Sequence, residues 1–134
     1  MPPRYLLDTN TASYIIKGNV PRVRERLLKV PMSQVLISAV TEAELLFGVA
    51  RKREAVRLKT AIDEFLLRVE PLPWDSSAAR RYADLRAALE IEGMPVGNLD
   101  MMIAAHALAA DAVLVTNDRS FRRLRLLKIE DWTK

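Results

Sequence analysis

Short apolar runs alternate along the chain with longer segments whose apolar residues recur at helical spacing. Four runs have the length and composition of buried strands: "RYLL" (4–7), "QVLIS" (34–38), "VEPL" (69–72) and "AVLVT" (112–116). The run at 69–72 includes Pro71 and is followed by Pro73, so it fits only a short edge strand. Strands separated by helices are typical of α/β domains with a mainly parallel sheet flanked by helices.

Three helical segments can be placed between and after these runs. One begins near Asn10, and one follows "QVLIS" directly. Another begins after Asp75, a predicted N-cap, continues through apolar residues such as Tyr82 and Leu89, and ends at Gly93. No internal repeat and no linker interrupts this order, so we expect residues 1–134 to form a single domain.

The helix predicted at "ISAVTEAELLFG" carries two glutamates that face different surroundings. At about 100° per residue, Glu44 lies on the same side as Val40 and Phe47, while Glu42 lies nearly opposite. We therefore predict that Glu44 points into the protein and Glu42 into water. Because an unpaired buried carboxylate is costly, Glu44 needs a partner of positive charge.

Three aspartates complete a candidate acidic set. Asp8 directly follows the first strand and Asp118 the strand at 112–116, and in parallel sheets ligands collect at these carboxyl ends. Asp100 lies in the first turn of "LDMMIAAHALAA" (99–110), where free N–H groups favour a carboxylate and Asn98 is a predicted cap. Each aspartate alone also fits a turn, a cap or a first-turn position. Together with Glu44 they would repel one another without a cation, which predicts Mg²⁺ or Mn²⁺.

Composition narrows the chemistry further. The chain has 134 residues, of which 50% are hydrophobic, and no apolar run approaches the roughly 20 residues that cross a bilayer. The start lacks the pattern of a secretory signal, so we expect a cytoplasmic protein without membrane contact. The absence of cysteine excludes thiolate catalysis and cysteine-ligated zinc. His106 is the only histidine, so no histidine pair can cleave RNA, and we expect it to satisfy a hydrogen bond in the core.

The motifs that carry these acids resemble those of a known family. The matching motifs are "LLDTN", "ISAVTEAELLFG", "PVGNLDMMIAAHAL", "LVTND" and the terminal "EDW". Through them the chain resembles PIN-domain ribonucleases of the VapC toxin type from Leu6 to Trp132. The resemblance implies a parallel sheet flanked by helices, Mg²⁺-dependent endoribonuclease activity and a role as the toxin of a type II toxin–antitoxin system. It matches Asp8, Glu44, Asp100 and Asp118 to the family's four acids, the last being the most variable.

The resemblance also implies supporting residues and a substrate. Asn10 and Thr116 stand where the family has polar groups that hold the acids, although Asn10 also fits an N-cap. "PVGNLDMMIAAHAL" and "EDW" are most similar to members that cut a tRNA, which is an analogy about substrate only.

A metal-activated water would hydrolyse the RNA and leave 5′-phosphate and 3′-hydroxyl ends. A net charge of +4 and a pI near 9.7 fit a polyanionic substrate. Predicted RNA contacts beside the last acid are Arg119, Arg122, Arg123, Arg125 and Lys128, with a second group at Arg22, Arg24 and Arg26. The alternative for both groups is a solvated surface.

Partners follow from the resemblance and from the apolar pattern. The family implies a small VapB-type antitoxin and a homodimer, and Leu45 and Val49 lie opposite Val40 as an apolar stripe that either binds a partner or is covered by another helix.

Three other function classes are alternatives to a nuclease. An aspartyl-nucleophile phosphatase would need Asp-x-Asp where this chain has Asn10, and a nucleotide-binding module would need a glycine-rich turn where "LLDTNTAS" has none. A catalytically inactive PIN-like RNA-binding or regulatory module stays open.

Overall fold

The computed structural model of the chain describes residues 2–52, 54–93 and 96–134. Over these residues five strands form one sheet, ordered β3-β2-β1-β4-β5, in which every pairing is parallel. The strands are β1 (Tyr5–Leu7), β2 (Val35–Ser38), β3 (Pro71–Leu72), β4 (Val113–Val115) and β5 (Ile129–Glu130). The α-helices are α1 (Thr9–Lys17), α2 (Pro21–Leu27), α3 (Ala39–Ala50), α4 (Val56–Arg68), α5 (Ser76–Glu92) and α6 (Asn98–Ala109), with two 3-10 helices, η1 (Met32–Gln34) and η2 (Arg119–Arg123). The predicted α/β fold with a parallel sheet is confirmed.

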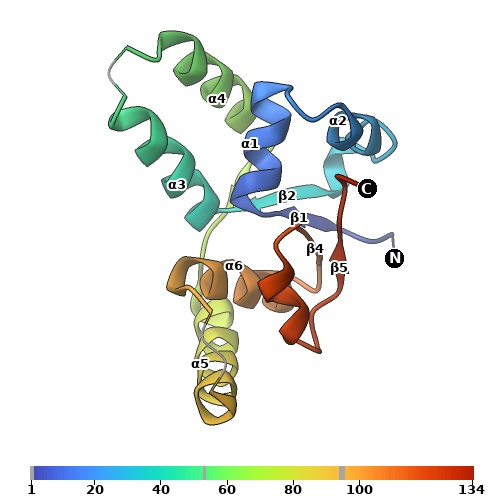
Figure 1. Cartoon of the computed structure of the whole chain (residues 1–134), viewed down its shortest axis with the longest axis vertical. Helices are drawn as coiled ribbons and strands as arrows, with labels where there is room; N and C mark the ends of the chain where they lie inside the picture. The colour runs from blue at the N-terminus through green and yellow to red at the C-terminus, as the bar shows by residue number, and fades with distance from the viewer. Residues whose placement is uncertain (1, 53, 94–95) are drawn as a thin grey trace.

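Helices cover both faces of the sheet, and each face has its own core. In Figure 1, α1 to α4 lie on one side of the strands, and α5 and α6 lie on the other. Strand residues alternate between the two cores, as pleating requires: Leu6 belongs to the core that includes Ile103 of α6, whereas Leu7 belongs to the core that includes Ile62 of α4. A buried parallel sheet of this kind explains why the strands read as continuous apolar runs.

The chain order reverses at the middle strand. From β1 the chain adds β2 and β3 on one side, and then returns to add β4 and β5 on the other. In open parallel sheets this reversal leaves a crevice beyond the carboxyl ends of the strands. The residues that directly follow β1 and β4 therefore lie side by side at this edge of the sheet.

The strand predictions hold with one omission. "VEPL" contains the two-residue edge strand β3, with Pro71 at the edge where a missing N–H is tolerated. Strand β5 was not predicted, because Ile129–Glu130 is too short to show any alternation. Nearby Trp132 is buried in the core, tilted against the ring of Tyr5, and its Nε1 donates to Oε1 of Glu130 at 3.0 Å. In this chain, the terminal "EDW" therefore completes the core.

The observed helix caps agree with the predicted ones at α5 and differ from them at α1 and α6. Asp75 caps α5 by accepting from the N–H of Ala78, and Gly93 ends it in the left-handed conformation at φ 66°. Helix α1 is capped by Asp8, so a capping role for Asn10 is wrong. The cap predicted at Asn98 is also wrong: Gly97 occupies that position without a side-chain bond, and Asn98 is the first helical residue.

The buried face of α3 differs from the predicted one. Phe47 was expected inside but is 64% exposed, whereas Leu45 was expected outside but is 7% exposed and packs with α4. Val49 is half-buried, and so is Glu42, which was expected in water. Apolar residues surround α3 on all sides, so periodicity could not single out the face that α4 covers.

The expectation that the chain makes no membrane contact can be compared with the length and apolar character of its helices. Among the described residues, no helix combines the length and the apolar character needed to cross a bilayer.

Candidate active site

Two of the four predicted acids stand at the carboxyl ends of adjacent strands. Asp8 follows β1, and its N–H donates to the carbonyl of Val115 at 3.0 Å, which continues the pairing of β1 with β4. Asp118 follows β4 by three residues and is half-buried. Both therefore lie at the carboxyl edge of the sheet, at the reversal of strand order.

Asp8 is held by the start of α1. Its Oδ1 accepts from the N–H of Thr11 at 2.8 Å, and the hydroxyl of Thr11 donates to the carbonyl of Val115 at 3.1 Å. Asp8 is 4% exposed, and this burial raises the pKa of its carboxyl, as does the charge of Asp118, while hydrogen bonds from Thr116 and Thr11 oppose the rise. Asp8 is thus both a helix cap and a desolvated carboxylate.

Glu44 reaches the site from α3 and contacts α1. The hydroxyl of Thr9 lies 2.7 Å from Oε1 of Glu44 and 3.2 Å from Oγ1 of Thr41. Since that hydroxyl has one proton, it donates to the carboxylate and accepts from Thr41. Glu44 is half-buried on the side of α3 that faces α1. Glu42 is half-buried as well, and Phe47, which was predicted to share the side of Glu44, is exposed, so the predicted contrast between the two glutamates is not seen.

Asp100 and Asp118 occupy turns that fix their backbones. Asp100 lies in the first turn of α6, as predicted, and is half-buried. Burial raises the pKa of its carboxyl, and the charges of Asp118, Glu44 and Asp8 raise it further. Asp118 starts η2 by accepting from the N–H of Ser120 at 2.9 Å, while its own N–H donates to the hydroxyl of Thr116 at 3.0 Å. The four acids are therefore close enough to act on one another electrostatically.

The four carboxylates are suitable ligands for a hard divalent cation, but they lie farther apart than the ligands of a bound ion would. None of the four acids forms a salt bridge with another described residue, so their repulsion is uncompensated. Within residues 2–52, 54–93 and 96–134, however, no three acidic or histidine side chains lie close enough to hold one ion as they stand. Carboxylate oxygens are the ligands that Mg²⁺ and Mn²⁺ prefer, and these acids would have to turn toward one another to share one.

The two predicted supporting residues differ in their surroundings. Thr116 is 2% exposed, and its hydroxyl bonds both to Asp8 and to the N–H of Asp118. Asn10 is exposed on α1 and lines a small hollow together with Glu44. Sequence reasoning did not identify Thr9, although a hydroxyl next to the first acid, in the first turn of a helix, was a signal for it.

His106 has the structural position that was expected for it. It is 4% exposed, and its Nδ1 lies 2.7 Å from Oγ of Ser38, which also accepts from the N–H of Val40 to cap α3. Burial lowers the pKa of the imidazole, and the charge of Asp75 opposes this shift. The Ser38 hydroxyl thus connects α6, which carries Asp100, to α3.

The two predicted basic groups are placed differently. The five residues beside the last acid are all exposed on and after η2: Arg119, Arg122, Arg123, Arg125 and Lys128. In the second group, Arg22 and Arg26 donate to the carbonyl of Lys134, and Arg26 also pairs with Glu130 at 3.3 Å. Arg24 lines a separate hollow between α1, α2 and α4. Two members of the second group therefore hold the end of the chain.

Sequence relatives cover nearly the whole chain. A family model described as "PIN domain" matches residues 5–127. The tRNA(fMet)-specific endonuclease VapC of Salmonella typhimurium is 38% identical over 130 residues, which is 96% of this chain and 98% of that protein. Ribonuclease VapC2 of Rickettsia felis is 35% identical over 132 residues, 97% of this chain and 98% of that protein.

Solved structures agree with the sequence relatives. The chain superposes on VapBC2 from Rickettsia felis bound to a promoter DNA fragment with a TM-score of 0.88 and 33% identity, covering 96% of this chain and 98% of that one. DNA-bound VapBC from Salmonella typhimurium gives a TM-score of 0.85 at 36% identity, covering 98% and 99%. The order of the acids, the parallel sheet and these relatives lead to one conclusion: the chain belongs to the PIN-domain family and, within it, to the VapC ribonucleases.

Proposed function

We propose that the protein is a divalent-metal-dependent endoribonuclease that acts as the toxin of a VapBC pair. The observation that carries this proposal is the convergence of Asp8, Glu44, Asp100 and Asp118 beyond the sheet, where burial and mutual charge raise the pKa of Asp8 and Asp100. Desolvated acids without a basic partner are typical of functional sites rather than of stable cores.

The four acids would hold the metal, which when bound supplies a Lewis acid that activates water and offsets charge on the phosphodiester. The protein's own part is to fix the carboxylates. Asp8 is held through the N–H of Thr11, Glu44 through the hydroxyl of Thr9, and Asp118 through the backbone of η2. Asn10 and Thr116 support this set, Thr116 through its hydrogen bonds to Asp8 and Asp118.

The substrate in this proposal is RNA, and the Salmonella relative's name favours a tRNA. The exposed arginines of η2 lie next to Asp118 and would contact the backbone beside the scissile bond. Hydrolysis by water gives 5′-phosphate and 3′-hydroxyl ends, whereas attack by the ribose hydroxyl would give a cyclic phosphate.

The test is cleavage of RNA by purified protein, freed of any copurified partner, with Mg²⁺, with Mn²⁺ and with a chelator. Sequencing of RNA 5′ ends after induced expression identifies the target and the end chemistry. Cleavage that survives the chelator contradicts the metal requirement. RNA binding without cleavage under all metal conditions would favour the alternative of an inactive RNA-binding or regulatory module.

The proposed partners are a VapB-type antitoxin and a second copy of the chain, in the cytoplasm. VapBC complexes among the similar structures support the antitoxin. The stripe from which a homodimer was first inferred is not available, because Leu45 is buried, so the dimer depends on the family resemblance. Light scattering of the purified chain and copurification with a co-expressed upstream reading frame test both partners.

A further inference from the structure

A glycine in the interior of α3 is not required by the packing of that helix. Gly48 follows Glu44 by one helical turn, at a position where alanine would make the helix more stable. A methyl group added to Gly48 would meet no neighbouring atom within 4 Å, and its φ is not positive. Neither crowding nor backbone conformation therefore explains this glycine. Glycine is also used where a ligand approaches the backbone closely.

Gly48 lines a small groove between α1 and α3, the α1–α3 groove, of about 180 Å³. One end of the groove is at the hydrogen bond from Thr9 to Glu44, which is 2.7 Å long. In Figure 1 the two helices leave the same edge of the sheet and diverge toward α4, which contributes Leu58 and Ile62 to the groove. The groove therefore begins directly beside the second of the four acids.

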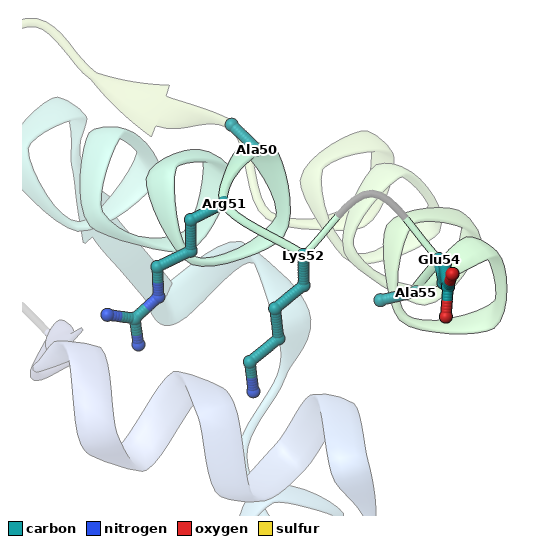
Figure 2. A pocket seen from close by; sticks show the side chains of 5 residues that line it. All are labelled: Ala50, Arg51, Lys52, Glu54 and Ala55. Carbon is teal, nitrogen blue, oxygen red and sulfur yellow. The ribbon is translucent and has the colours of Figure 1, made fainter.

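The surface that the α1–α3 groove presents to solvent is basic. Its polar and charged lining residues are Asn10, Ser13, Lys17, Glu44, Arg51 and Lys52. The three cations are exposed, whereas its apolar lining residues are buried or half-buried. In Figure 2 the side chains of Arg51 and Lys52 extend from the end of α3 toward α1, while Glu54 lies apart. A ligand that enters from solvent meets three positive charges and one negative charge.

The three cations are not neutralised by the protein. None of Lys17, Arg51 and Lys52 forms a salt bridge with a residue in 2–52, 54–93 or 96–134. The guanidinium carbon of Arg51 lies 5.5 Å from the ring centroid of Phe47, a contact that leaves its N–H groups available. Lys17 also suits the C-terminal end of α1, where the helix dipole favours a cation. The excess of positive charge favours an anionic ligand.

We infer that the α1–α3 groove binds one internal phosphate of the RNA backbone, next to the scissile phosphodiester. Lys17, Arg51 and Lys52 would surround this phosphate, and Gly48 would let it lie close to α3. This inference rests on the proposed function and adds the path of the substrate, from the η2 arginines past the acids to the groove. These residues position the substrate and take no part in bond breaking.

Size and charge favour a phosphate over a segment of a partner protein. The groove is smaller than the pockets of roughly 300–1,000 Å³ that hold drug-sized ligands, so it suits a single small group. An apolar side chain would gain nothing from the three exposed cations. In a ribonuclease, a substrate whose cleaved bond lies at Glu44 brings further phosphates to this end of the site, where Arg51 and Lys52 offset the charge of the acid.

The first test uses Gly48 variants of the full chain, freed of any copurified partner, and RNA oligonucleotides in the presence of a chelator. Gly48→Ala should melt at or above the wild-type temperature, because alanine favours the helix and its methyl group enters open space. It should nevertheless bind RNA several-fold more weakly, and Gly48→Leu more weakly still. With metal, Gly48→Ala should raise KM and leave kcat nearly unchanged.

The second test removes the cations one at a time. Lys17→Gln and Lys52→Gln should each weaken RNA binding several-fold and lower its salt slope by roughly one. Lys59→Gln is the matched control, because Lys59 is an exposed lysine of α4 that does not line the groove, and it should bind like wild type. Oligonucleotides with and without a terminal 5′-phosphate should bind equally, because the groove takes an internal phosphate.

The binding and cleavage measurements fail separately. Wild-type protein that binds RNA through Lys17 and Lys52 but never cleaves it would contradict the proposed function and support the phosphate site. Unchanged affinity and KM in Gly48→Ala, or an equal loss of affinity in Lys59→Gln, would overturn the site alone.

The remaining outcomes also decide against the proposal. A need for the terminal 5′-phosphate would overturn the internal position. A melting temperature of Gly48→Ala well below that of wild type would overturn the role given to this glycine, while the lysine variants still test the phosphate. Release of a copurified protein partner by Gly48→Ala, with RNA affinity intact, would assign the groove to that partner and overturn the phosphate site.

Discussion

The hydroxyl of Thr9 lies 2.7 Å from Oε1 of Glu44, so the first turn of α1 is bonded directly to α3. Thr9 follows Asp8, the cap of α1, in the chain. The first two acids of the candidate site are therefore separated by one residue and one hydrogen bond, although they are 36 positions apart in the sequence. A shift of α3 relative to α1 would change their separation at once.

Glu44→Gln should reduce cleavage strongly, whereas Glu42→Gln should change it little. Glu44→Gln keeps the shape but removes a charge that would offset the cation, so cleavage should fall at least about 10-fold while stability holds or rises, because repulsion among the acids is relieved. Glu42 is half-buried but forms no salt bridge among the described residues, so Glu42→Gln should change stability by no more than about 0.5 kcal/mol and leave cleavage near wild type. The measurement is initial cleavage rate against Mg²⁺ concentration, with thermal melts. An inactive Glu42→Gln beside an active Glu44→Gln would contradict the placement of Glu44.

Comparing Asp8→Asn with Asp8→Ala should separate the role of Asp8 as the cap of α1 from its role in cleavage. Both variants should lose cleavage, because both remove the carboxylate. Asparagine is a good helix cap and alanine a poor one, so Asp8→Ala should be less stable than Asp8→Asn by about 1 kcal/mol. Denaturant titrations of both variants check this difference. Equal stability would mean that the bond to Thr11 contributes nothing to α1.

The raised pKa of Asp100 predicts how stability depends on pH. The folded protein keeps this proton at pH values where the unfolded chain has lost it, so the contribution of Asp100 to stability falls as pH rises from its ordinary pKa of 3.8 through the folded value. Asp100→Asn removes this titration. In chelator, the melting temperature of the variant minus that of wild type should therefore increase across this window. Mg²⁺ should reduce the difference at neutral pH, and a difference that is constant with pH would contradict the shift.

Ser38→Ala should destabilise the fold through two helices at once. The Ser38 hydroxyl caps α3 at Val40 and lies 2.7 Å from the buried Nδ1 of His106. Losing the cap and leaving the imidazole unpaired should cost about 2–3 kcal/mol. Asp75→Ala, which removes the cap of α5 but leaves the hydrogen bond between Ser38 and His106, should cost about 1 kcal/mol. Chemical denaturation of the two variants measures both values, and similar losses would contradict the double role of Ser38.

The two basic groups should respond differently to loss of charge. Arg122→Gln combined with Arg123→Gln should weaken RNA binding several-fold and flatten its salt dependence by roughly one unit per lost contact. Arg26→Gln should instead lower the melting temperature, since Arg26 pairs with Glu130 and with the carbonyl of Lys134. Binding titrations at several salt concentrations, with Arg81→Gln on α5 as control, distinguish these effects. An unchanged salt slope would leave the η2 arginines as a solvated surface.

The sequence predicted four of the five strands but not every helix face. Apolar runs located four strands, and the carboxyl ends of β1 and β4 placed Asp8 and Asp118 at the same edge of the sheet. The helix periodicity of α3 failed because that helix is apolar all round, so the exposure of Phe47 and the burial of Leu45 depend on where α4 packs. That long-range contact has no signature within α3 itself.

The supporting contacts were harder to predict than the acids. An aspartate that follows a strand can be predicted from its neighbours in the sequence. The hydrogen bond from Thr9 to Glu44, in contrast, joins residues that are 35 positions apart. The cation–π contact of Arg51 with Phe47 could not be predicted either, because it requires Phe47 to be exposed and the sequence pattern placed it inside. Local sequence therefore predicts which residues carry charge, and packing decides which neighbours position them.

Both margins of the sheet end in strands of two residues, β3 and β5, and β3 begins with a proline. Such short margins offer almost no free backbone N–H and C=O groups for an additional strand. A second copy or a partner protein would therefore associate through helical surfaces rather than by extending the sheet. The same geometry protects newly made chains from edge-to-edge aggregation before any partner is bound.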